Sequence, residues 1–138
     1  MTTNTMTTNT RKTHTTTAQN VRTFSAEPSK KAGLLPAAIV PGLGNVVSTF
    51  ADIGPSNTQE LTVTITGFNL TTDVPAAVVC QPRQNANQDF QFPDIFGVQV
   101  VATSATQIVV RISRLDAAGG WGQDLRLDIL IFDSVNNP

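Results

Sequence analysis

Residues 125–133, LRLDILIFD, decide the predicted fold of this 138-residue chain. Successive side chains of a β-strand point to opposite faces of its sheet. From residue 125 to residue 131, one face of this segment is wholly apolar and is formed by Leu125, Leu127, Ile129 and Ile131. The opposite face is polar at first and then apolar, with Arg126, Asp128, Leu130 and Phe132 in that order. This pattern predicts a strand that is buried on one face and covered near the end of the other.

Other segments share this two-residue period or are short apolar runs. Residues 60–66, ELTVTIT, alternate strictly, and the remaining segments are 45–51, 76–82, 97–103 and 107–115. The short Ser104-Ala105 connection predicts that the segments 97–103 and 107–115 form an antiparallel hairpin. Because no part of residues 44–138 shows a sustained helical period, we expect an all-β fold, a small antiparallel β-sandwich.

Four outward-facing apolar side chains need an explanation in such a small sandwich: Val101, Val109, Leu130 and Phe132. They are candidates for a subunit interface, because association would cover them and protect the edges of the sheets. The alternative is that they face the second sheet or a loop of the same chain.

Composition narrows the possible functions. Charged residues make up 14% of the chain, against roughly 25% in average soluble domains. The single histidine, His14, lies near the N-terminus, and the single cysteine, Cys80, lies in an apolar segment and reads as a core residue. We therefore expect no enzyme, no catalytic residues, no metal site and no cofactor.

The net charge of −1 hides an uneven distribution along the chain. Residues 1–31 carry a charge of +4, and residues 32–138 carry −5. We divide the chain into residues 1–43, an extended Thr-rich basic arm with a Pro/Gly linker, and residues 44–138, the sandwich. The arm is either a solvated tail or a segment that contacts an acidic partner through Arg11, Lys12, Arg22, Lys30 and Lys31. A protein partner is expected before nucleic acid, because the chain as a whole is not basic.

Residues 111–128, RISRLDAAGGWGQDLRLD, hold the strongest candidate for a recognition site. The only tryptophan, Trp121, lies in a glycine-flanked loop there. An exposed indole beside charged and amide groups suits contact with a glycan or a protein. The candidate positions are Arg114, Asp116, Trp121, Gln123 and Arg126. The alternative is an indole that folds back over the end of the sandwich.

Two stretches resemble known families. A Pro-led apolar strand followed by FGVQVVATSATQIVVRISRLD and GWGQDLRLDILIF resembles H-type lectin-like β-sandwich modules over about residues 75–133. That resemblance implies trimers and sugar binding near subunit boundaries, at Arg114, Asp116, Trp121 and Gln123. Residues 49–67, TFADIGPSNTQELTVTITG, are similar to small β-modules of tailed-phage structural proteins, including fibres and capsid decoration proteins.

These features together predict a phage structural protein, a capsid cement or decoration protein. It would form a homotrimer, sit on the capsid surface of the virion and contact the major capsid protein or another virion protein through its arm. Because residues 1–20 contain no apolar stretch of a secretory signal and no segment is long enough to span a bilayer, we expect synthesis in the host cytoplasm and no membrane partner. The alternative is a carbohydrate-binding H-type lectin-like module, free or on a phage fibre.

Overall fold

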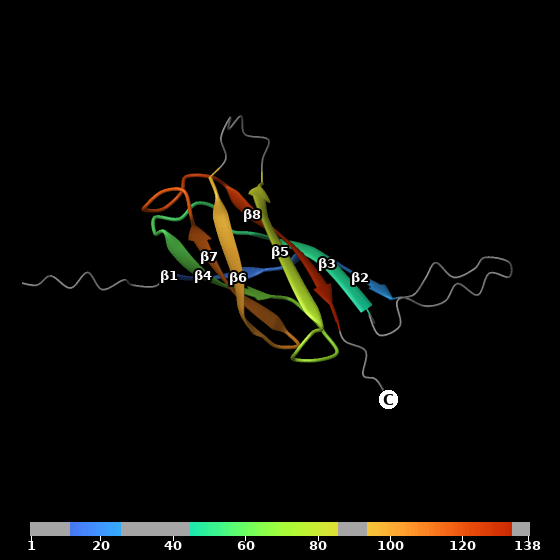
Figure 1. The fold of residues 1–138 in the computed structure, drawn as a ribbon. Coiled ribbons are helices and arrows are strands. Elements are labelled where there is room, and N and C mark those ends of the chain that lie inside the picture. The colour runs from blue at the N-terminus through green and yellow to red at the C-terminus, as the bar shows by residue number, and fades with distance from the viewer. Residues whose placement is uncertain (1–11, 26–44, 86–93, 134–138) are drawn as a thin grey trace, which may run out of the picture.

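The computed structural model describes residues 12–25, 45–85 and 94–133, and these contain eight β-strands and no helix (Figure 1). The strands form two four-stranded sheets whose inner faces enclose one hydrophobic core. The predicted all-β sandwich is therefore confirmed. Within the described ranges there is no helix of the length and hydrophobicity that a membrane span requires.

Sheet A has the strand order β1-β4-β7-β6, and sheet B has the order β2-β3-β8-β5. The strands of sheet A are β1 (Lys12–Thr17), β4 (Glu60–Thr66), β7 (Gln107–Arg114) and β6 (Phe96–Thr103). The strands of sheet B are β2 (Gln19–Ser25), β3 (Asn45–Asp52), β8 (Leu125–Phe132) and β5 (Ala77–Gln84). All pairs are antiparallel except β1 with β4, which is parallel.

Strand β8 lies in the interior of sheet B, between β3 and β5. Its four inward side chains, Leu125, Leu127, Ile129 and Ile131, are at most 2% exposed. They pack against the inward residues of sheet A, which are Leu61, Val63 and Ile65 on β4 and Ile108, Val110 and Ile112 on β7. The alternation in the sequence thus gave the correct inward face for three strands.

The predicted strand boundaries agree closely with the observed ones. Strand β4 has the predicted limits, and the predicted hairpin is formed by β6 and β7. Strand β5 continues through Pro82 to Gln84, two residues past the end of the predicted segment 76–82. Proline is tolerated there because β5 is an edge strand.

Residues 12–25, which belong to the predicted arm, supply one edge strand to each sheet. Strand β1 pairs with β4, and β2 pairs with β3. The chain changes sheets at Ala18, which is buried and whose N–H donates to the Thr66 carbonyl at 2.8 Å. Gly67 makes this crossing possible, since a Cβ there would lie 3.1 Å from Thr17 Cγ2 and its φ is +95°. Residues 1–11 and 26–44 of the predicted arm lie outside the described residues.

Cys80 lies on the inward face of β5 and packs against the core while remaining partly exposed. Burial raises the pKa of its thiol to about 11. The side chain therefore stays a neutral thiol at physiological pH, which agrees with the structural role expected for it.

We predict opposite outcomes for two leucines on the same strand. Leu127→Ala removes a fully buried side chain and should lower the free energy of unfolding by about 2–5 kcal/mol. Leu130→Ala, on the outer face and 36% exposed, should cost less than about 1 kcal/mol. Urea unfolding of both variants decides this, and equal losses would contradict the assignment of faces on β8.

Candidate functional site

The structure distributes the predicted site residues over two sheets and does not gather them in one site. Arg114 ends β7 in sheet A, and Asp116 follows in the next turn. Arg126 belongs to β8, and its side chain lies on the outer face of sheet B. Trp121 and Gln123 lie in the connection between β7 and β8 and are both buried.

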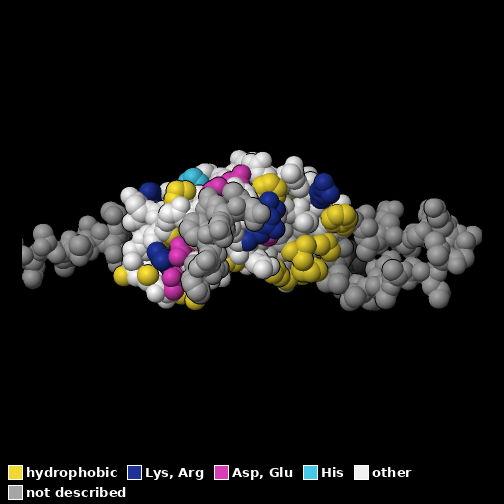
Figure 2. Space-filling model, turned by 90° about the horizontal axis from the view of Figure 1, so that it is seen from above, with side chains coloured by type: hydrophobic (Ala, Val, Ile, Leu, Met, Phe, Trp, Pro, Cys, Tyr) yellow, Lys and Arg dark blue, Asp and Glu magenta, His cyan; other side chains and the backbone are white. Residues whose placement is uncertain are grey.

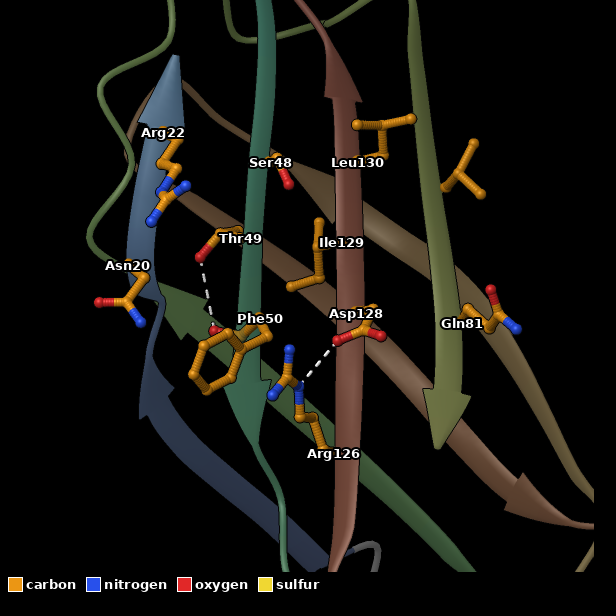
Figure 3. Close-up of a pocket in the computed structure, with 11 residues that line it drawn as sticks. Asn20, Arg22, Ser48, Thr49, Phe50, Gln81, Arg126, Asp128, Ile129 and Leu130 are labelled. Atoms are coloured by element: carbon orange, nitrogen blue, oxygen red, sulfur yellow. Dashed lines mark hydrogen bonds and ion pairs between the residues drawn. The ribbon is translucent and has the colours of Figure 1, made fainter. Parts of the chain in front are cut away.

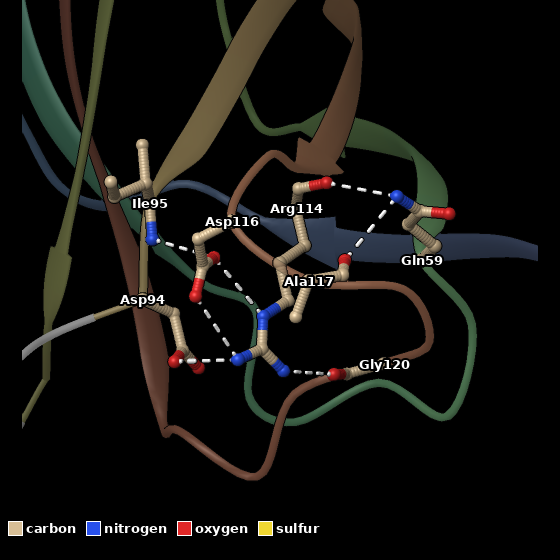
Figure 4. A network of polar contacts seen from close by, with 7 residues as sticks. All are labelled: Gln59, Asp94, Ile95, Arg114, Asp116, Ala117 and Gly120. Carbon is tan, nitrogen blue, oxygen red and sulfur yellow. Dashed lines mark hydrogen bonds and ion pairs between the residues drawn. The ribbon is translucent and has the colours of Figure 1, made fainter.

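Arg114 uses all three nitrogens of its guanidinium group within the chain (Figure 4). Its Nε and Nη2 atoms donate to the two carboxylate oxygens of Asp116 at 3.1 and 3.2 Å. Nη2 also contacts Asp94 Oδ1 at 2.9 Å, and Nη1 donates to the Gly120 carbonyl at 2.7 Å. Such a fork-to-fork pair fixes geometry strongly. Arg114 therefore holds the turn after β7 against the start of β6.

Asp116 is held from two sides. Besides Arg114, the backbone N–H of Ile95 donates to Asp116 Oδ1 at 3.0 Å (Figure 4). These hydrogen bonds, that of Arg114 first, lower the pKa of Asp116, and the same contact raises the pKa of Arg114. The pair is thus firmly ionised and occupied by its own chain.

Trp121 takes the arrangement in which the indole folds back over the end of the sandwich. The side chain is 3% exposed, and its Nε1–H donates to the Gly54 carbonyl at 2.9 Å. Its ring meets the Phe96 ring edge-on, with centroids 5.1 Å apart. The backbone pairs with Ser56, and a Cβ on neighbouring Gly120 would collide with the Ser56 carbonyl. The expectation of an exposed indole is wrong, and its ring faces are not free for stacking on a sugar.

Of the five basic residues predicted as arm contacts, two are described. Lys12 donates to Asn57 Oδ1 at 2.9 Å, and Arg22 projects onto the outer face of sheet B. Arg11, Lys30 and Lys31 lie outside the described residues.

The outer face of sheet B carries a row of apolar side chains that crosses all four strands. Cross-strand partners share a face in an antiparallel sheet. Phe24 pairs with Val46, Val46 with Phe132, and Phe132 with Ala77. Beside this row Leu130 pairs with Val79. We call these six residues, Phe24, Val46, Ala77, Val79, Leu130 and Phe132, the apolar end.

Several side chains of the apolar end are open to solvent. Phe24 is 57% exposed, Val79 52% and Leu130 36%. Figure 2 shows hydrophobic side chains gathered in one part of the surface with basic side chains next to them. Of the four outward apolar residues expected from the sequence, Leu130 and Phe132 belong to this face, whereas Val101 and Val109 lie in sheet A.

Next to the apolar end, and sharing Val79 and Leu130 with it, the same face has a hollow of about 510 Å³ (Figure 3). Arg126 lies in it, with Nε 2.8 Å from Asp128 Oδ1 and its guanidinium carbon 3.6 Å from the centre of the Phe50 ring. Arg83 reaches the other oxygen of Asp128 at 3.3 Å. Asn20 and Arg22 on β2 line one side, as Figure 3 shows. Arg126 is the only residue predicted from segment 111–128 that lines this hollow.

Sequence reasoning missed the parts of this face that come from other strands. Phe50 and Gln81 each alternate with inward residues, which signals that they point outward. Only the strand order shows that they lie on either side of Asp128. Among the described residues, no cluster of His, Cys, Asp and Glu has the arrangement of a metal site.

The ionised Asp116 should stabilise the fold in a pH-dependent way. Because its pKa is lowered in the folded chain, its contribution is present above the ordinary value of 3.8 and is lost as pH falls through the folded value. Asp116→Asn should therefore melt at a lower temperature than wild type at neutral pH. Thermal unfolding across the acid range should show this difference shrinking below pH 3.8. A difference that is constant with pH would contradict the role of the Arg114 pair.

The burial of Trp121 gives a direct spectroscopic prediction, because it is the only tryptophan of the chain. Its fluorescence should be blue-shifted and resistant to acrylamide in the folded protein, and quenching should rise several-fold in guanidinium chloride. Equal quenching in the folded and unfolded protein would show an exposed indole and restore the recognition role.

Comparison of the chain with protein-family models, with curated proteins and with solved structures finds no match. The resemblances of residues 75–133 to H-type lectin-like modules and of residues 49–67 to phage structural proteins thus remain predictions from the sequence. The functional candidate that the geometry provides is the outer face of sheet B, with its apolar end and its hollow.

Proposed function

We propose that the protein is a non-catalytic structural subunit that associates through the apolar end of sheet B. The observation that supports this is the row of exposed and half-buried apolar side chains across β2, β3, β8 and β5. Contiguous exposed apolar surface of this kind marks interaction sites in soluble proteins. The partner that suits it best is further copies of the same chain, because identical subunits that bury such a patch close into a symmetric oligomer.

The side chains of the apolar end that remain in water would gain free energy on burial in an interface. Fully burying a Phe, Leu or Val side chain is favourable by about 1.5–3 kcal/mol. Phe24 and Val79 are each more than half exposed, so each should contribute about 1 kcal/mol when an interface covers it. The same gain occurs in every copy that joins the contact.

The specific form of this proposal is a phage capsid cement or decoration protein, acting as a homotrimer. Its support is the resemblance of residues 49–67 and the basic character of residues 1–31. Many weak contacts repeated over a shell give high avidity, so modest interfaces suffice to stabilise it. This form requires the protein to be present in purified phage particles, which a compositional analysis of such particles decides.

A carbohydrate-binding module is the second candidate, and the hollow on sheet B favours it. The hollow combines the aromatic ring of Phe50 with the amides of Asn20 and Gln81. Such mixed apolar and polar linings are typical of small-ligand sites. Trp121, on which the sequence placed this function, takes no part in it.

Self-association tests the main proposal. Sedimentation equilibrium should show an oligomer for wild type, and Phe24→Ser should weaken association at least about tenfold, which is about 1.4 kcal/mol. Val101→Ser, a matched control because Val101 is 49% exposed but belongs to sheet A, should leave association unchanged.

A wild type that stays monomeric to its solubility limit would contradict association through this face. A loss of association in Val101→Ser but not in Phe24→Ser would move the interface to sheet A. Melting curves of both variants check that each remains folded.

A further inference from the structure

Two arginines at the hollow have hydrogen-bond donors that the chain leaves unused. Arg126 donates a hydrogen bond from Nε to Asp128, and within the described residues neither of its Nη atoms has a hydrogen-bond partner. Arg22 makes no side-chain hydrogen bond or ion pair to any described residue. Figure 3 shows the two guanidinium groups on the same side of the sheet, with Phe50 near Arg126.

Among the described residues, those around the hollow carry a net positive charge, although residues 32–138 carry −5 overall. Asp128 is the only acidic residue in the described lining, and both of its oxygens are occupied, one by Arg126 and one by Arg83. Asp52, which pairs with Arg126 across the strands, accepts a hydrogen bond from Asn85 at 2.8 Å. The hollow and its border therefore hold three arginines, Arg22, Arg83 and Arg126, but only two described carboxylates, Asp52 and Asp128. The donors that have no carboxylate partner belong to Arg22 and Arg126.

The rest of the lining suits a hydroxylated ligand with apolar faces. The side chains of Asn20, Ser48 and Gln81 have no hydrogen-bond partner among the described residues. Apolar surface from Val79 and Leu130 borders them. Amides and hydroxyls can both donate to and accept from sugar hydroxyls, while the apolar side chains cover the C–H face of a ring. The volume of about 510 Å³ is within the usual range of small-ligand sites.

We infer that this hollow binds an anionic saccharide, a sugar that carries a carboxylate or sulfate group. Acid groups of the saccharide would contact Arg22 and Arg126, whose planar forks match the oxygens of a carboxylate or a sulfate. Asn20, Ser48 and Gln81 would hold the hydroxyls of the ring. This inference rests on the second candidate function, whose ligand class it specifies, and it does not depend on self-association at the apolar end.

Isothermal titration of the full chain tests the inference with three probes: a heparin-derived hexasaccharide, an oligogalacturonate and a neutral cello-oligosaccharide. At least one acidic probe should bind, the neutral one should not, and binding should weaken with added salt. Arg126→Gln and Arg22→Gln should each reduce affinity at least about tenfold, the equivalent of one lost charged contact. Arg111→Gln, which removes an arginine paired with Glu60 in sheet A, is the matched control and should bind as wild type.

Two further variants keep the result interpretable. Arg126→Lys retains the charge but not the fork, so it should bind less tightly than wild type and more tightly than Arg126→Gln. Phe24→Ser disrupts the apolar end, does not line the hollow and should bind normally. Its normal binding would separate this site from the assembly proposal.

Three outcomes with the saccharide probes would overturn the inference. They are the absence of binding by both acidic probes, equal binding of the neutral probe, and undiminished binding by the folded double variant Arg22→Gln/Arg126→Gln. A poly-glutamate peptide that binds as tightly as the acidic saccharides would show that the hollow accepts acidic protein segments and would also overturn it.

Discussion

The alternation of side chains along β8 is the constraint on which both faces of sheet B depend. Inward, it places four aliphatic side chains in the core; outward, it places Arg126 and Asp128 in the hollow and Leu130 and Phe132 at the apolar end. A register slip of one residue would bury the charged pair and expose the aliphatic set. The stability of the core therefore keeps the outer face in a single arrangement.

The N-terminal strands complete this face. Residues 12–25 close one edge of each sheet, and β2 brings Phe24 to the apolar end and Arg22 to the hollow. The two regions lie on one sheet but differ in chemistry. One presents aliphatic and aromatic surface, and the other presents amide groups and guanidinium donors that have no partner among the described residues. Val79 and Leu130 belong to both regions. An oligomer that covers Phe24, Val46, Ala77 and Phe132 would still leave Arg22, Phe50 and Arg126 of the hollow available for a separate ligand.

Much of the fold could be predicted because β4, β7 and β8 bury one face each, and burial leaves a two-residue period in the sequence. Strands β1 and β2 leave no such signal. Within residues 12–25, the only buried apolar residue is Ala18, at the crossing between the two strands. The position of Trp121 was equally hidden, because its hydrogen-bond partner Gly54 is 67 residues away in the chain. The outer face of sheet B needed the strand order, since Arg22, Phe50, Gln81 and Arg126 come from four different strands.

The central claim is that the outer face of sheet B is the interacting surface of the molecule. Methyl NMR spectra recorded over a series of protein concentrations test it most directly, because each methyl group reports its own surroundings. The account predicts concentration-dependent shifts for Val46, Ala77, Val79 and Leu130, with Val101 and Val109 of sheet A unchanged. Shifts confined to Val101 and Val109 would contradict it.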